Sequence, residues 1–269
     1  MIRLSSGKIL LTETLGNRLS VLSKNGRFEK YIGSKGRGNG SFIGPQYVAE
    51  DFRGNIYATD YGNRRVVVFD KDGNALFVFG TSSKNFSGLK GPTGIAVLGD
   101  SVYVADDVKG CIYEFDLAGN FIRNLVLEGT FRRPESLKVW TDRLVVCDSN
   151  KVISVNTGET FENMNMGNAP SRITCAIPDV NGNVLVSDFK ANEVYVMARM
   201  QELVGGLFVQ IERVNAKNFP DVQLDVKVES LKRNPIVGLK EANFYITEDR
   251  RPVNKLKFLG AASENTYCD

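Results

Sequence analysis

Short apolar runs with a two-residue period dominate the first 200 positions of the chain, and each run is bounded by Gly, Asn or Asp. This pattern predicts β-strands separated by tight turns. In the strand predicted at 56–59, one face carries Ile56 and Ala58, and the opposite face carries Tyr57 and Thr59. Because both faces are largely apolar, we expect each sheet to lie between two neighbouring sheets rather than against solvent.

A unit built from two such strands recurs along the chain. It consists of a Gly or Asn turn, an apolar strand that ends in an acid, a polar loop, and a second apolar strand followed by another turn. The clearest copies span 7–33, 54–80 and 100–125, and weaker copies begin at Asp142 and Gly182. The acids that end the first strand are Glu13, Asp60, Asp106, Asp148 and Asp188, at spacings of 47, 46, 42 and 40 residues. That period is expected of one four-stranded blade of a β-propeller.

A further strand precedes every unit except the first, and a proline usually opens it. These prolines are Pro45, Pro92, Pro134 and Pro170; proline at a strand's first residue removes no hydrogen-bond donor that the sheet needs. Each blade therefore has four strands, A to D, and five blades are visible. We expect the first blade to lack strand A, because the chain begins close to its strand B, and the fifth blade to use LFVQIERV at 207–214 as its strand D.

The motif D-x-x-N-R-x-V-x-V-F-D-x-x-G at 60–73, with Phe79–Gly80 and with G-P-x-G-I-A-V at 91–97, resembles the NHL repeat. The resemblance covers residues 1 to about 200. It implies a propeller of six blades, so five visible blades predict that the sequence is a segment of a longer polypeptide. The expected fold is therefore all-β, with an NHL-type β-propeller over residues 1–206.

The pattern changes after Phe219. The phrase FPDVQLDVKV, followed by PIVGLKEANFYITED, resembles the small β-domain that precedes von Willebrand type A domains in bacterial surface and secreted proteins. This resemblance implies a partial immunoglobulin-like sandwich over residues 207–269. It also favours an extracytoplasmic location, in the periplasm or at the cell surface.

The composition restricts the chemistry that the chain can perform. There is no histidine, which removes Ser-His-Asp and Cys-His catalysis and His-ligated metals together. None of the four cysteines lies in a CxxC pair, and Cys147 and Cys175 stand where sister repeats carry small or apolar residues, so we expect buried structural thiols. No apolar run is long enough for a membrane span. We therefore expect no enzyme activity, no cofactor and no metal.

The strand-end acids allow two interpretations. Carboxylates arranged around an axis can chelate Ca²⁺. Alternatively, an acid between a strand and a loop accepts backbone N–H groups of the following turn. The acid is present in every copy, whatever the loop sequence, and this favours the second interpretation. We expect structural turn caps at Glu13, Asp60, Asp106, Asp148 and Asp188.

The distribution of charge is more informative than the formal net charge of +3. Four antiparallel strands place the B–C loops and the D–A connections between blades on one face of the disk, which we call the upper face. Basic residues dominate these loops, whereas acids dominate the A–B and C–D turns of the opposite, lower face. The candidate partner-binding residues of the upper face are Lys35, Arg37, Arg64, Arg65, Arg132 and Arg133.

Three functions are compatible with these features. The favoured one is a non-enzymatic scaffold whose basic upper face docks a protein or an anionic surface polymer. The second is a Ca²⁺-dependent lactonase or related hydrolase, an activity of other six-bladed propellers, which needs a Glu/Asn/Asp cluster that the sequence does not reveal. The third is RNA binding, which some animal NHL propellers perform, although the upper loops offer few aromatics for base stacking: Tyr61, Phe86, Phe131 and Phe189.

Overall fold

The computed structural model describes residues 1–158, 161–166, 171–179, 183–197, 207–230, 234–244, 246–248, 251–253 and 256–260. The chain divides into two compact units, Met1–Pro178 with Val184–Val194, and Asp179–Asn183 with Tyr195–Asp269. The boundary predicted between 206 and 207 adjoins residues 198–206, which lie outside the described ranges. Within these ranges, no helix has the length and apolar character needed to cross a membrane.

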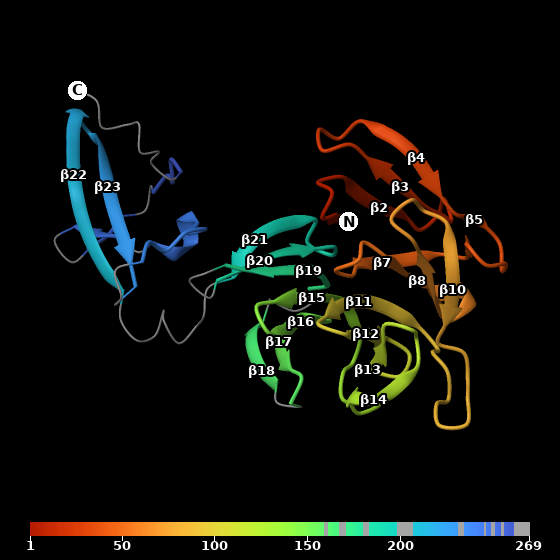
Figure 1. The fold of residues 1–269 in the computed structure, drawn as a ribbon. Helices are drawn as coiled ribbons and strands as arrows, with labels where there is room; N and C mark the ends of the chain where they lie inside the picture. The colour runs from red at the N-terminus through yellow and green to blue at the C-terminus, as the bar shows by residue number, and fades with distance from the viewer. Residues whose placement is uncertain are drawn as a thin grey trace. The chain divides into compact units, whose positions relative to one another are not determined.

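The first unit is a β-propeller in which five antiparallel sheets surround a common centre (Figure 1). Blade 1 consists of β1 (Ile2–Arg3), β2 (Ile9–Glu13), β3 (Arg18–Leu22) and β4 (Phe28–Ile32). Blade 2 consists of β7 (Pro45–Glu50), β8 (Ile56–Asp60), β9 (Arg65–Phe69) and β10 (Ala75–Phe79). Between them, β5 (Ser34–Lys35) and β6 (Ser41–Phe42) form a short parallel pair.

The remaining blades follow the same order. Blade 3 consists of β11 (Pro92–Leu98), β12 (Ser101–Asp106), β13 (Cys111–Asp116) and β14 (Phe121–Val126). Blade 4 consists of β15 (Pro134–Trp140), β16 (Arg143–Asp148), β17 (Lys151–Asn156) and β18 (Phe161–Met166). Blade 5 shows three strands in the described ranges, β19 (Ile173–Pro178), β20 (Val184–Asp188) and β21 (Glu193–Met197). The predicted five-blade, all-β architecture is thus confirmed.

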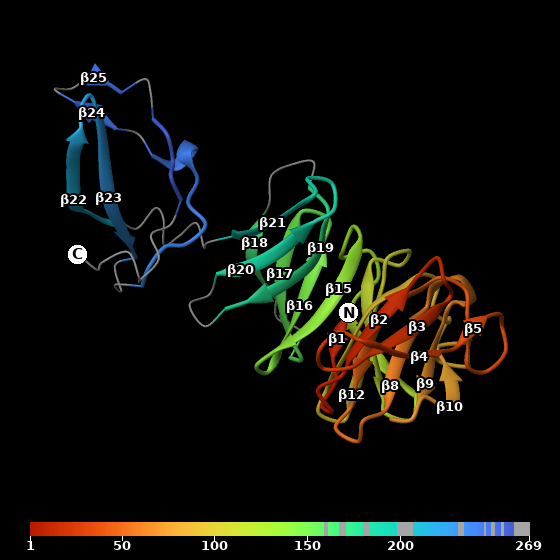
Figure 2. The same cartoon turned by 90° about the horizontal axis from the view of Figure 1, so that it is seen from above.

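The innermost strands β7, β11, β15 and β19 lie side by side around the centre, and the fourth strands lie at the periphery (Figures 1 and 2). Pro45, Pro92 and Pro134 open three of these inner strands, as predicted, whereas Pro170 lies outside the described residues. The hydroxyl of Tyr47 on β7 donates to the backbone oxygen of Thr174 on β19 at 3.0 Å. Blades 2 and 5 therefore meet across the centre of the ring.

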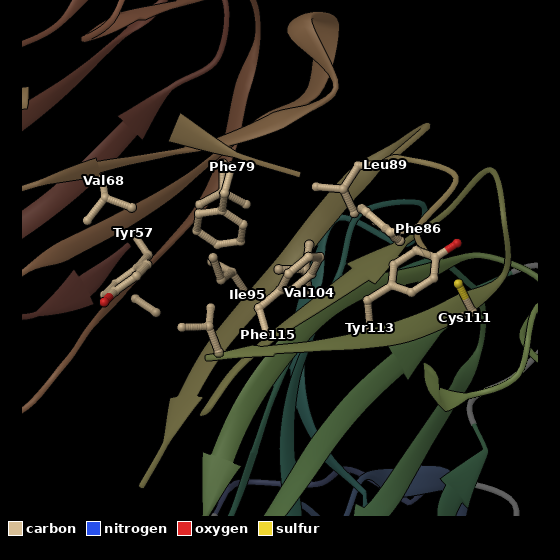
Figure 3. Packing of buried hydrophobic residues seen from close by; sticks show 13 residues of the cluster. Tyr57, Val68, Phe79, Phe86, Leu89, Ile95, Val104, Cys111, Tyr113 and Phe115 are labelled. Atoms are coloured by element: carbon tan, nitrogen blue, oxygen red, sulfur yellow. The ribbon is translucent and has the colours of Figure 1, made fainter. Parts of the chain in front are cut away.

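The core lies between the blades. Between blades 2 and 3, Phe79 stands 5.0 Å from Phe115 and Phe86 stands 5.0 Å from Tyr113, measured between ring centroids (Figure 3). Similar clusters of buried apolar residues join blades 1 and 2 and blades 3 and 4. Apolar side chains on both faces of blades 2 and 3 are needed because each of these faces is buried against a neighbouring sheet.

Two expectations about individual strands were wrong. Blade 1 does have a strand A: Ile2 and Arg3 pair with Leu10 and Ile9. This strand of two residues is too short to show an alternating pattern. The segment predicted as strand D of blade 5 belongs instead to β22 (Phe208–Asn218), which pairs with β23 (Asp221–Glu229). The two runs are adjacent in sequence and their apolar positions match, so the segment pairs in a local hairpin instead of joining blade 5.

The second unit, described by itself, is built on the β22–β23 hairpin. Val209 faces Val228 and Ile211 faces Val226 across the pair. A second small sheet pairs β24 (Thr247–Glu248) with β25 (Arg251–Pro252), and a 3-10 turn covers Glu241–Asn243. An immunoglobulin-like sandwich in this unit stays a prediction.

Candidate functional site on the upper loop face

The B–C loops and the D–A connections hydrogen-bond to one another, so together they form one surface. The N–H of Gly129 donates to Lys109 O at 2.8 Å, and that of Phe131 donates to Gly110 O at 2.9 Å. In the last blade, Phe189 N–H donates to Arg172 O at 2.8 Å. The upper face expected from strand topology therefore exists as a continuous hydrogen-bonded structure.

The strand-end aspartates hold this surface to the blades. Asp106 is fully buried, and its Oδ1 accepts the N–H groups of Val108 (3.2 Å) and Lys109 (3.0 Å) in the following loop. The same carboxylate also accepts N–H groups from the connection that enters the blade, those of Lys90 (2.7 Å) and Gly91 (3.0 Å). One carboxylate thus fixes a B–C loop and a D–A connection at once. The second pairing was not predicted, because it joins residues about 16 positions apart.

The other aspartates repeat this contact with the incoming connection. Asp60 accepts the N–H of Ile43, Asp148 accepts those of Arg132 and Arg133, and Asp188 accepts that of Arg172. Burial opposes ionisation of Asp188, but hydrogen bonds from Ser171 and from the N–H groups of Arg172, Ala191 and Lys190 outweigh it and lower the pKa to about 2. The four carboxylates therefore anchor backbone amides of the incoming connections.

Glu13 differs from the four aspartates. Its carboxylate receives the Nε–H of Arg18 at 2.8 Å and a short hydrogen bond from the Ser20 hydroxyl. The Arg18 guanidinium also lies over the Tyr31 ring, 3.6 Å from its centroid. Because all of these partners are side chains of blade 1 itself, Glu13 does not show the predicted capping of backbone N–H groups.

Five of the six predicted basic residues are exposed on the upper face: Lys35, Arg37, Arg64, Arg132 and Arg133. None of them has a carboxylate partner within ion-pair distance among the residues that the structure describes. Arg64 is displayed at the end of a 3-10 turn with φ +55°. These side chains are positioned to meet an anion from outside the chain.

Arg65 does not belong to this set. Its side chain is only 10% exposed, and its Nε donates to the fully buried Asp60 at 2.9 Å. The two terminal nitrogens donate to the backbone oxygens of Arg37, Gly38 and Ser41. Arg65 is the first residue of strand β9, so its side chain points into the blade interface and ties the 33–42 connection to blade 2. The expectation that it contacts a partner was wrong.

The acids of the lower face have a local structural role. In the motif D-x-x-G-N, the aspartate accepts the N–H and the side-chain amide of the asparagine four residues later, each at 2.8–3.0 Å; the aspartates are Asp51, Asp70, Asp116 and Asp179. Such side-chain-to-backbone bonds favour tight turns. The acidic character of the lower face therefore arises in part from how its turns are made.

Several charged and aromatic side chains converge near the centre of the upper face. Arg172 forms two parallel hydrogen bonds with Glu135, at 2.9 and 2.6 Å, and lies 5.0 Å from the ring centroid of Phe189. Burial raises the pKa of the nearby Asp107 carboxyl, which lies close to Tyr61. The Oδ1 atom of Asp107 has no hydrogen-bond partner within the described ranges. Blades 2 to 5 all contribute to this cluster.

The cluster does not form an evident metal site. Across the residues that the structure describes, no group of three or more His, Cys, Asp or Glu side chains could hold a metal ion. Cys111 and Cys147 are fully buried, and burial raises the pKa of the Cys111 thiol to about 12. Cys175 is partly exposed, contrary to the expectation of full burial, and Cys268 lies outside the described residues.

Comparison with known proteins identifies the fold. A family model described as DUF5128, a 6-bladed β-propeller, matches residues 1–78. No curated protein matches the chain significantly.

Solved structures with the same fold differ in activity. A streptogramin B lyase is 18% identical with a TM-score of 0.57, and the alignment covers 83% of this chain and 66% of the lyase, just under two thirds. A nidogen/laminin complex has a similar chain at 18% identity and a TM-score of 0.60, covering 74% of each chain. A putative gluconolactonase is 14% identical with a TM-score of 0.55, covering 74% of this chain and 73% of that one. At these identities the likeness establishes the β-propeller fold alone.

Proposed function

We propose that this propeller is a non-enzymatic interaction scaffold whose upper face docks an anionic partner. The observation that carries the proposal is the set of exposed bases, Lys35, Arg37, Arg64, Arg132 and Arg133, none of which forms an ion pair within the described part of the chain. The loops that display them are fixed by buried aspartates, so little ordering is needed on binding. Arg also suits contacts with carboxylates and other planar anions, because its guanidinium donates two parallel hydrogen bonds.

Two features support a scaffold over an enzyme. The absence of histidine removes the commonest general acid–base group. A Ca²⁺-dependent lactonase requires several oxygen ligands at one point, and the described residues bring no such acidic group together. The nidogen/laminin complex is an example of this fold within a protein assembly.

RNA binding remains the alternative for a basic face. Base stacking needs exposed aromatic rings, but of the four aromatics in the upper loops, Phe86 and Phe131 are each only 6% exposed. Tyr61 is half-buried and Phe189 is exposed. Recognition of a protein or an anionic polymer therefore fits the face better.

The finer assignments from sequence resemblance belong to the same proposal. These are membership of the NHL class, an immunoglobulin-like second unit of the kind that precedes von Willebrand type A domains in bacterial proteins, and an extracytoplasmic location. Each concerns where the scaffold acts rather than how its upper face binds.

The test compares two charge-matched variants on immobilised poly-L-glutamate and dextran sulfate. R37S+R64S removes two bases from the upper face, whereas R53S+K71S removes two exposed bases from lower turns. The upper-face variant should bind about tenfold more weakly at low ionic strength, because an exposed ion pair contributes about 0.5–1 kcal/mol. The lower-face variant should bind as the unmodified protein does. Equal effects of the two variants would refute docking by the upper face.

A further inference from the structure

Exposed apolar side chains stand among the bases of the upper face. Leu15 is 96% exposed, Val108 is 62% exposed and Phe189 is 64% exposed. Each lies in a B–C loop, one or two residues after the strand-end acid of blade 1, 3 or 5. A single exposed apolar residue is ordinary. Three in the equivalent loop of alternate blades, on the face that carries the unpaired bases, indicate a shared role.

These apolar tips are held in place by the scaffold. Asp106 accepts the N–H of Val108 at 3.2 Å. The N–H of Phe189 donates to Arg172 O at 2.8 Å, and the Phe189 ring rests 5.0 Å from the Arg172 guanidinium. Leu15 O accepts a hydrogen bond from Asn17 at 3.1 Å. Apolar groups fixed in this way can be buried by a partner with little loss of conformational entropy.

We infer that the partner of the upper face is a protein surface on which carboxylates stand next to apolar side chains. Leu15, Val108 and Phe189 contact the apolar part, while Arg37 and Arg64 contact the carboxylates. This inference rests on the proposed function and narrows its partner class. Protein interfaces are typically enriched in aromatic residues and Arg, with polar groups around an apolar centre.

The same observations disfavour the two other polyanionic partners. A polymer that carries only charged groups, such as poly-L-glutamate, offers no apolar side chains, so contact with it leaves the three tips without a matching group. An anionic lipid surface would accept the tips and bases but would repel the carboxylates of the same face. Glu128, 40% exposed and ion-paired with Lys109 at 2.8 Å, and the half-buried Asp107 both lie on this face. A protein can place donors opposite these acids, whereas a uniformly anionic surface cannot.

The experiment measures binding to three defined probes. They are poly-L-glutamate, a random copolymer of glutamate and tyrosine, and vesicles of phosphatidylcholine with phosphatidylserine. The test variant, L15S+V108S+F189S, removes the three tips. The matched control, F52S+L76S+I122S, removes exposed apolar side chains of a lower turn and two peripheral strands. Thermal melting checks that both variants fold.

The unmodified protein and the control variant should bind the copolymer roughly tenfold more tightly than poly-L-glutamate, because partial burial of three apolar side chains accounts for such a ratio. The L15S+V108S+F189S variant should bind the two polymers equally. The inference is overturned if the unmodified protein shows no preference, or if the variant keeps it. Preference for vesicles, lost in the variant, would identify a lipid surface instead. If binding depends on Arg37 and Arg64 but the protein does not prefer the copolymer over poly-L-glutamate, only the inference fails. If the protein binds none of the three probes, the proposed function fails as well.

Discussion

Arg64 and Arg65 are neighbours in sequence, yet their replacement should have opposite consequences. Arg65→Ser removes a guanidinium that donates to Asp60 at 2.9 Å and to three backbone oxygens of the 33–42 connection at 2.8–2.9 Å. The Asp60 carboxylate, fully buried, then loses its counter-ion. Loss of one member of a buried ion pair costs about 3–5 kcal/mol. Arg64→Ser changes an exposed side chain and should stay within about 0.5 kcal/mol.

The assay is thermal unfolding of the two variants, followed by circular dichroism at one scan rate. At about 2–4 °C per kcal/mol for a domain of this size, Arg65→Ser should lower Tm by roughly 6–20 °C. Arg65→Lys should recover only part of the loss, because one ammonium group cannot reach the carboxylate and all three carbonyls. Binding to poly-L-glutamate should show the reverse order, with Arg64→Ser the weaker binder. Similar Tm values for the two serine variants would refute the buried role of Arg65.

Three further outcomes follow from the packing and the shifted pKa values. Gly94→Ala should destabilise the propeller by about 1–3 kcal/mol, because the added Cβ would lie 2.5 Å from the backbone nitrogen of Leu137 in the next blade; Gly38→Ala, whose Cβ has space, is the control for the urea melts. Burial raises the pKa of Asp107, so its ionisation opposes folding as the pH rises above the ordinary carboxyl range. Asp107→Asn should therefore raise Tm at neutral pH, and the gain should shrink on acidification; a pH-independent difference would contradict this account. With its pKa raised to about 12 by burial, Cys111 should resist a thiol reagent in the folded protein and react on unfolding, as peptide mapping would show.

The repeat itself could be predicted from sequence because it rests on local patterns. A two-residue apolar period, turns rich in Gly and Asp, and a recurring acid are all visible without three-dimensional information. The role of the acids was predicted only in part. Capping of the next loop is a local contact, whereas the bond from Asp106 to Lys90 N–H depends on how two distant segments meet.

Errors arose where one residue type fits two environments. Arg64 and Arg65 both stand in a basic loop sequence, but β9 begins at Arg65, and this single step turns its side chain inward. In the same way, an alternating run near Phe208 fits either a blade or a hairpin. This run pairs with the matching run at 221–229, which is closer in sequence than the strands of blade 5. Phe189 was placed in an upper loop from the sequence, whereas the exposed Leu15 and Val108 were missed because Leu and Val in a strand-rich sequence suggest a core.

Because the strand-end aspartates anchor the upper loops, the position of a loop does not depend on the loop's own sequence. The loop after Asp148 has two residues and the loop after Asp188 has four, yet each aspartate accepts an N–H group from the same point of the incoming connection. Loop length and composition can therefore vary while the blades stay constant, as the variable loops of an antibody do on their β-sandwich. Replacement loops grafted between an anchoring aspartate and the next strand should keep the blade intact, which makes this propeller a candidate frame for engineered binding surfaces.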